Sequence, residues 1–157
     1  MRRVLTVLAG STLLSTAAIA EDVKLGIIFG FTGPIESLTQ PMAAAAELAM
    51  KEATDSGIFL GGSTVSSVRG DSTCIDSAAA VSAAERLVTS DKVNAIVGGD
   101  CSGVTGAILQ NVARPNGIVM ISPSATSPAL STVEDNNLFF RTAPSDARQG
   151  QVVADIL

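Results

Sequence analysis

Glycine and hydroxyl residues directly follow two short apolar runs, where they could hold a small polar molecule. The first block, Gly98–Gly103 (GGDCSG), follows the apolar run 93–97, and the second, Ile121–Leu130 (ISPSATSPAL), follows the run 118–121. Both runs are typical of buried strands, and ligands of open α/β sheets collect beyond the carboxyl ends of the strands. We therefore expect these blocks to bind a ligand. They contain no obvious groups that would change it chemically.

Ser102 and Thr126 are the two hydroxyl residues on which this expectation depends. Ser102 stands at the expected start of a helix, where free N–H groups and the helix dipole favour an anion such as a ligand carboxylate. Thr126 offers a second hydroxyl, and the backbone carbonyl of Ser124 can accept a hydrogen bond from an ammonium group. Two simpler interpretations stay open: Ser102 as an ordinary helix cap, and residues 122–128 as a proline-stiffened turn.

The catalytic and cofactor-binding motifs that the sequence suggests do not have the chemistry they need. Residues 99–103 (GDCSG) resemble the loop around a nucleophilic serine or cysteine, but histidine most often activates such a nucleophile, and the chain has none. The glycines after residue 25 lack the spacing of a dinucleotide-binding loop, and Asp71, Asp76 and Asp100 fit no calcium-binding loop. We therefore expect a binding protein rather than an enzyme, with no cofactor and no metal.

The charge balance argues against nucleic acid as a partner. Ten Lys and Arg stand against 15 Asp and Glu, a formal net charge of −5, and no long basic run is present. Nucleic acids and anionic lipids attract basic surfaces, so an acidic chain favours a small-molecule ligand instead.

Residues 1–20 have the pattern of an export signal. Arg2 and Arg3 precede a mostly apolar segment, 4–14, and Ala18-Ile19-Ala20 matches the small-x-small pattern of a cleavage site after Ala20. The apolar segment is shorter than the roughly 20 residues that a membrane-spanning helix needs. We expect the mature chain to be periplasmic, and a retained membrane anchor is the alternative.

Two cysteines, Cys74 and Cys101, follow this segment. Exported proteins meet an oxidising compartment, which favours a disulfide between the two. Two unpaired, buried thiols are the alternative. A zinc site is disfavoured, because two cysteines without histidine supply too few ligands.

The remaining pattern alternates strands and helices with short connections. This alternation predicts an α/β fold: a Rossmann-like open parallel sheet with helices on both faces. The chain stops inside an apolar, helix-like stretch, which suggests a fragment of a longer protein. We expect strands at 23–29, 64–69, 93–97, 118–121 and 138–141, and helices at 41–56, 76–89, 102–113 and from 146 onward.

Several short motifs, taken in order, resemble the first lobe of exported solute-binding proteins of the branched-chain amino acid type. Such proteins deliver ligands to ATP-binding-cassette importers. The resemblance covers residues 22–157. It rests on Gly33-Pro34 before an Ala-rich helix, Asp71 followed by Cys74, Cys101-Ser102, Ser122-Pro123-Ser124-Ala125-Thr126, Arg141-Thr142-Ala143-Pro144-Ser145-Asp146 and Gln149-Gly150.

The resemblance implies two α/β lobes that close on a ligand in the cleft between them. Residues 21–141 would form the first lobe, and residues 142–157 a crossover and the start of a truncated second lobe. The partners implied are an amino acid or similar small carboxylate and a membrane permease. A ligand-sensing receptor ectodomain or an amide- or urea-binding protein on the same fold is the alternative, and an exported hydrolase is a third, weaker one.

The resemblance also implies roles for individual residues. Ser102 and Thr126 would hold the carboxylate and amino group of the ligand with help from the backbone at Ser124, and Cys74 and Cys101 would form a disulfide. Leu38 takes a cleft position that is often aromatic in the family. Asp100 takes a place that is often apolar, and a carboxylate near the pocket would favour a polar or cationic ligand side chain. The full candidate ligand-binding set is Leu38, Asp100, Cys101, Ser102, Ser124, Ala125 and Thr126.

Overall fold

A five-stranded, wholly parallel sheet organises the chain in a computed structural model that describes residues 21–157. The export signal expected at residues 1–20 lies outside the described residues. The strand order β2-β1-β3-β4-β5 confirms the expected open parallel sheet, and each strand lies within two residues of its predicted bounds. The strands are β1 (Val23–Phe29), β2 (Val65–Asp71), β3 (Ala95–Gly98), β4 (Val119–Ser122) and β5 (Phe139–Arg141).

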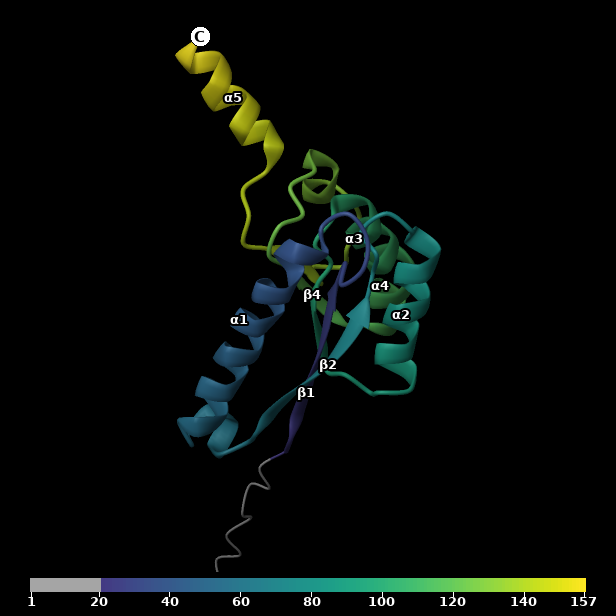
Figure 1. The fold of residues 1–157 in the computed structure, drawn as a ribbon, viewed down its shortest axis with the longest axis vertical. Coiled ribbons are helices and arrows are strands. Elements are labelled where there is room, and N and C mark those ends of the chain that lie inside the picture. Colours follow the sequence, from purple (N-terminus) through teal and green to yellow (C-terminus); the bar gives the residue numbers. More distant parts are fainter. Residues whose placement is uncertain (1–20) are drawn as a thin grey trace, which may run out of the picture.

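Helices connect the strands and cover both faces of the sheet (Figure 1). Asp76 caps α2 as expected, because its carboxylate accepts hydrogen bonds from the N–H groups of Ala78 and Ala79. The helix that begins at Ser102 continues through a π-helical turn into α4. The helices are α1 (Glu36–Asp55), α2 (Ser77–Thr89), α3 (Ser102–Ile108), the π-helical η2 (Leu109–Ala113), α4 (Arg114–Asn116) and α5 (Asp146–Ile156), with 3-10 turns η1 (Phe59–Gly61) and η3 (Pro128–Ser131).

The start of α1 differs from the prediction. We expected the Ala-rich helix to begin at Pro41, but it begins at Glu36 and contains Pro41. Proline there removes the hydrogen bond to the carbonyl of Ser37, an exposed residue whose carbonyl water can solvate. The buried Thr39 hydroxyl also donates to the Gly30 carbonyl at 2.9 Å, which fixes this first part of α1 to the end of β1.

The core lies in two layers, one on each face of the sheet. Ile28 and Ile96 face α2 and α3, together with Leu87 and Ile108. Ile27 and Phe29 point to the other face, where α1 contributes Ala43 and Met50. This alternation along β1 is that of a strand buried on both sides, which explains its nearly continuous apolar sequence.

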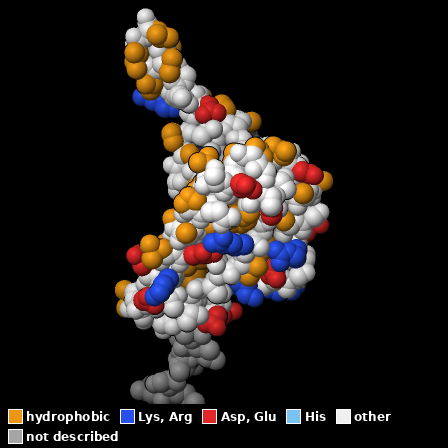
Figure 2. Space-filling view, viewed as in Figure 1, with side chains coloured by type: hydrophobic (Ala, Val, Ile, Leu, Met, Phe, Trp, Pro, Cys, Tyr) orange, Lys and Arg blue, Asp and Glu red, His pale blue; other side chains and the backbone are white. Residues whose placement is uncertain are grey.

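Over β4 and β5, the α1 face of the sheet is not covered by a helix of the described residues. The register pairs Val97 with Ile121, and Ile121 with Phe140, so these side chains share that face. Ile121 and Phe140 are exposed. Helix α5 extends away from the sheet in Figure 1 and buries none of its residues, and Figure 2 shows its hydrophobic side chains at the top of the view.

Candidate ligand-binding site

The loops after β3 and β4 lie side by side and are joined by Ser122, the last residue of β4. Its buried hydroxyl donates to the Gly99 carbonyl at 2.6 Å and accepts from the N–H of Ala125 at 2.9 Å. Sequence reasoning missed this role, although a hydroxyl residue closing a buried strand is a signal that could have suggested it. Ala125 is wholly buried beside this contact.

Ser102 and Thr126, the two hydroxyl residues singled out by the sequence, lie on these adjoining loops. The Ser102 hydroxyl accepts a hydrogen bond from the N–H of Ser127 at 3.1 Å, and Ser127 directly follows Thr126. Ser102 is not the cap of α3, which was one of the two interpretations that the sequence left open. Cys101 occupies the cap position without a side-chain hydrogen bond, and the Ser102 side chain holds the neighbouring loop instead.

The Thr126 hydroxyl lies against the start of α5. It donates to the carboxylate of Asp146 at 3.0 Å, and the N–H of Asp146 donates to the Thr126 carbonyl at 2.9 Å. Thr126 is half-buried and Asp146 is exposed. Two hydrogen bonds therefore connect the loop after β4 to the segment that follows β5.

Arg141, the last residue of β5, engages two carbonyls of the same loop. Its guanidinium donates to Ala125 at 3.2 Å and to Ser127 at 2.8 Å. Within residues 21–157, the carbonyl of Ser124 accepts no hydrogen bond, while the Ser124 hydroxyl donates to the Asp100 carbonyl at 2.9 Å. Sequence reasoning included Arg141 only in a motif and assigned it no contact.

The carboxylate of Asp100 is turned into the protein, and its expected contact with a ligand stays a prediction. Asp100 is only 4% exposed. One carboxylate oxygen accepts from the N–H of Gly30 at 2.8 Å, and the other accepts from the Ser72 hydroxyl at 3.2 Å. The carboxylate turns inward because these two donors, at the ends of β1 and β2, compensate its desolvation.

The expected disulfide between Cys74 and Cys101 is present, with the two Cα atoms 5.3 Å apart. It joins the loop after β2 to the residue before Ser102. The Cys101 carbonyl also accepts hydrogen bonds from the N–H and the hydroxyl of Thr105. Cys101 is thus committed to internal contacts through its sulfur and its carbonyl, and these contacts fix the position of Ser102.

Leu38 lies on the first turn of α1 and is 61% exposed. Nearby, a hollow of about 370 Å³ is lined by Phe31, Glu36, Ser37 and Gln40. Because α1 starts just beyond β1, Leu38 is at the same edge of the sheet as Ser102 and Thr126. The structure brings Leu38 to this edge, and the N–H of Gly30, in the loop before α1, donates to the Asp100 carboxylate in the loop of Ser102.

Asp71, the last residue of β2, organises the loop after β1. Burial raises the pKa of its carboxyl, but hydrogen bonds outweigh that effect and hold the pKa below its ordinary value. The donors are the Thr32 hydroxyl at 2.6 Å and the N–H groups of Thr73, Thr32 and Phe31. The negative charge of Asp71 is therefore stabilised by the folded loop.

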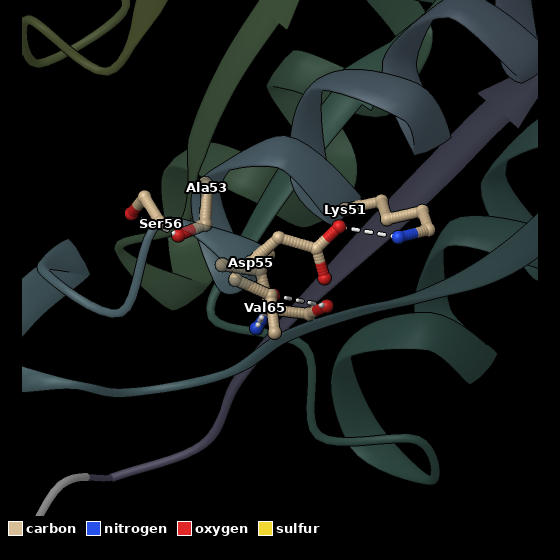
Figure 3. Close-up of polar contacts among 6 residues, drawn as sticks. Lys51, Ala53, Asp55, Ser56 and Val65 are labelled. Carbon is tan, nitrogen blue, oxygen red and sulfur yellow. Dashed lines mark hydrogen bonds and ion pairs between the residues drawn. The ribbon is translucent and has the colours of Figure 1, made fainter.

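Two other hollows run along α1, away from Ser102 and Thr126. One, of about 340 Å³, includes Lys51 and Thr54 in its lining, and the other, of about 350 Å³, is apolar. Figure 3 shows the end of α1, where Lys51 and Asp55 form an ion pair. The N–H of Val65 donates to the Thr54 hydroxyl at 2.8 Å. Since β2 begins at Val65, this is the amino edge of the sheet, where open α/β sheets do not collect ligands.

Residues 21–157 contain no group of three or more side chains suited to hold a metal ion. In the same part of the chain, no helix has the length and apolar character needed to cross a membrane. The carboxyl edge of the sheet presents hydroxyl, N–H and carbonyl groups beside the charged side chains of Arg141 and Asp146.

The chain belongs to the periplasmic binding protein family, whose model matches residues 22–157. It is 32% identical over 151 residues to the Leu/Ile/Val/Thr-binding protein of Salmonella typhimurium, covering 95% of this chain and 40% of the relative. It is also 32% identical over 155 residues to the leucine-specific-binding protein of the same organism, covering 98% and 41%. The chain thus spans about 40% of the length of these curated relatives, whose names describe binding proteins.

Solved structures agree with the fold. A leucine binding protein from Thermotoga maritima superposes with a TM-score of 0.73 at 27% identity, covering 84% of this chain and 35% of that one. A branched-chain amino acid transporter substrate binding protein from Streptococcus pneumoniae, in complex with isoleucine, gives a TM-score of 0.62 at 30% identity, covering 80% and 34%.

Proposed function

We propose that this chain forms the first lobe of an exported solute-binding protein that holds an amino acid or related small carboxylate between two lobes and delivers it, chemically unchanged, to an ATP-binding-cassette permease. The observation that carries this proposal is a hydrogen-bond donor, Ser102, and an unpaired acceptor, the Ser124 carbonyl, on adjoining loops at the carboxyl edge of the sheet. A zwitterion requires such a pair, because its carboxylate accepts and its ammonium donates.

Ser102 provides the donor. A backbone N–H can only donate, so the bond from Ser127 uses the Ser102 oxygen as an acceptor and leaves its hydroxyl hydrogen free. That hydrogen is available to a ligand carboxylate. A hydrogen bond to a charged group is worth about 1.5–3 kcal/mol, so Ser102 can contribute substantially to affinity.

The Ser124 carbonyl provides the acceptor. Arg141 engages the carbonyls of Ala125 and Ser127, and the Asp146 N–H engages that of Thr126. Among residues 21–157, no donor engages the Ser124 carbonyl. A ligand ammonium beside it would satisfy its hydrogen-bonding capacity. Ala125 and Asp100 support these groups by internal contacts.

Export and lobe boundaries complete the proposal. The pattern at residues 1–20 and the Cys74–Cys101 disulfide both support a periplasmic location, because disulfides persist in oxidising compartments. We propose that residues 21–141 form the first lobe, and that residues 142–157 lead toward a second one. The absence of buried residues in α5 supports this division of the described chain.

A thermal-shift screen of the full-length protein, the complete product of the gene that encodes this chain, tests the proposal. The twenty standard amino acids, several amides and several aromatic acids serve as candidate ligands. At 100 times its Kd, a ligand stabilises the folded state by about 2.7 kcal/mol, which gives a clear shift of several degrees. We expect at least one amino acid to give that shift. Stabilisation by none of the amino acids would contradict the proposed ligand class.

A further inference from the structure

The hydrogen-bond direction of the Thr126 hydroxyl is fixed in this structure. Its partner at 3.0 Å is a carboxylate oxygen of Asp146, and an ionised carboxylate only accepts hydrogen bonds. The single hydroxyl hydrogen of Thr126 is therefore used in the hydrogen bond to Asp146. Only the lone pairs of the Thr126 oxygen remain, so toward a ligand this hydroxyl is an acceptor.

The Ser102 hydroxyl has the opposite role and is left as a donor toward a ligand. Its oxygen already accepts from the N–H of Ser127, so its hydrogen is left to donate. Two hydroxyls on adjoining loops, chemically alike in the sequence, are thus made unlike by their protein partners. One is set to face the carboxylate of a ligand and the other to face its ammonium.

Asp146 is held in place by more than its side chain. Its N–H donates to the Thr126 carbonyl at 2.9 Å, so the two residues are bridged at two points. The guanidinium of Arg141, which acts on the same loop, donates to the carbonyls of Ala125 and Ser127. The carboxylate of Asp146 also brings a negative charge behind the Thr126 oxygen, which attracts a cationic group.

We propose that Asp146 is a positioning residue that fixes Thr126 as an acceptor and thereby makes the site selective for ligands with a cationic amine over carboxylates that lack one. This inference rests on the proposed function, because it takes the edge near Ser102 and Thr126 as the ligand site. It adds a selectivity determinant from the segment after β5, outside the two loops that bear the hydroxyls.

The variant Asp146→Asn gives the side chain a hydrogen-bond donor beside its acceptor oxygen while keeping its size. Its amide group can donate to the Thr126 oxygen, which turns the hydroxyl hydrogen outward and removes the negative charge. A ligand ammonium then meets a donor, whereas the carboxylate end of the ligand still meets Ser102. A loss of structure would weaken the binding of all ligands alike. A change of Thr126 from acceptor to donor weakens the binding of only those ligands that carry the amine.

Calorimetry on the full-length protein separates these effects with two probes, L-leucine and 4-methylpentanoate, its analogue without the amine. If the thermal screen favours another amino acid, that amino acid and its deamino analogue replace them. The measured quantity is the ratio of the two Kd values. We expect Asp146→Asn to reduce the preference for the amine-bearing probe at least tenfold. Asp146→Glu, which keeps an acceptor-only group, should retain more of it.

The control is Asp155→Asn, a change of the same type on the same helix, where the carboxylate accepts a hydrogen bond from Gln151. It should leave the ratio within twofold of the wild-type value. If the wild type prefers the amine-bearing probe and Asp146→Asn keeps that preference, the inference is wrong and the proposed function stands. If the wild type binds no amino acid, the proposed function fails and the inference fails with it.

Discussion

The backbone nitrogen of Ser127 lies 3.1 Å from the hydroxyl oxygen of Ser102, across 25 residues of sequence. This bond joins the loop after β4 to the start of the helix after β3. It also determines which way the Ser102 hydroxyl can act, because an N–H donor leaves the hydroxyl hydrogen unused. A contact between two serines thus fixes both the shape of the candidate site and the chemistry of its donor.

Reduction of the Cys74–Cys101 disulfide should destabilise the protein. The bond closes a loop between cysteines 27 positions apart, and the chain-entropy account gives about 3–4 kcal/mol for a loop of that size. Thermal unfolding of the full-length protein with and without a reductant measures the effect. The double variant Cys74→Ser/Cys101→Ser should unfold at the lower temperature in both conditions. Equal unfolding of the wild type in both conditions would contradict this prediction.

Asp71→Asn should lower the free energy of unfolding at neutral pH. It should also make that free energy decrease less steeply as the pH falls. The folded pKa of Asp71 lies below the ordinary value of 3.8, so its extra stabilisation is present above that value and disappears as the pH falls through the folded pKa. Partial exposure limits the loss at pH 7 to about 1 kcal/mol. Urea unfolding from pH 7 to pH 2 tests this. Glu52→Gln, on the exposed side of α1, is the control, and a variant curve parallel to the wild type throughout would refute the role of Asp71.

Asp100→Asn should destabilise the fold more than a surface substitution of the same type. The amide has one acceptor oxygen for two donors, Gly30 N–H and the Ser72 hydroxyl, and it places an N–H₂ group in a buried site. An unsatisfied buried polar group costs about 1–3 kcal/mol. Glu85→Gln, exposed on α2, should change stability by less than about 0.5 kcal/mol. Equal denaturation midpoints for the two variants would show that the Asp100 carboxylate does not hold these loops.

The sheet could be predicted because its strands are visible in the sequence as short apolar runs. The apolar runs at 23–29 and 118–121, separated by helix-forming segments, allow few arrangements other than a buried parallel sheet. The end of α1 near Ser56 was also predictable from Gly57. Its start was not, because a proline inside the first turns is tolerated when the carbonyl it leaves free belongs to an exposed residue, here Ser37.

The hydroxyl residues could be assigned to the site, but their partners could not. The positions of Ser102 and Thr126 after two strands place both at the same edge of the sheet. Whether each hydroxyl donates or accepts depends on Ser127 and Asp146, which approach only in the folded chain. The internal partners of Asp100 could not be predicted for the same reason. A carboxylate after a strand can face the cleft or turn inward, and the N–H of Gly30, 70 residues away, decides the matter.

Binding calorimetry on Ser102→Ala and Thr126→Ala variants of the full-length protein tests the central claim most directly, with the amino acid that the thermal screen selects as ligand. Each change removes a hydrogen bond to a charged group of the ligand, worth about 1.5–3 kcal/mol, so affinity should fall by about tenfold to a hundredfold. Ser82→Ala, exposed on α2, should bind like the wild type. If both site variants bind as tightly as Ser82→Ala, the ligand does not lie between these two hydroxyls.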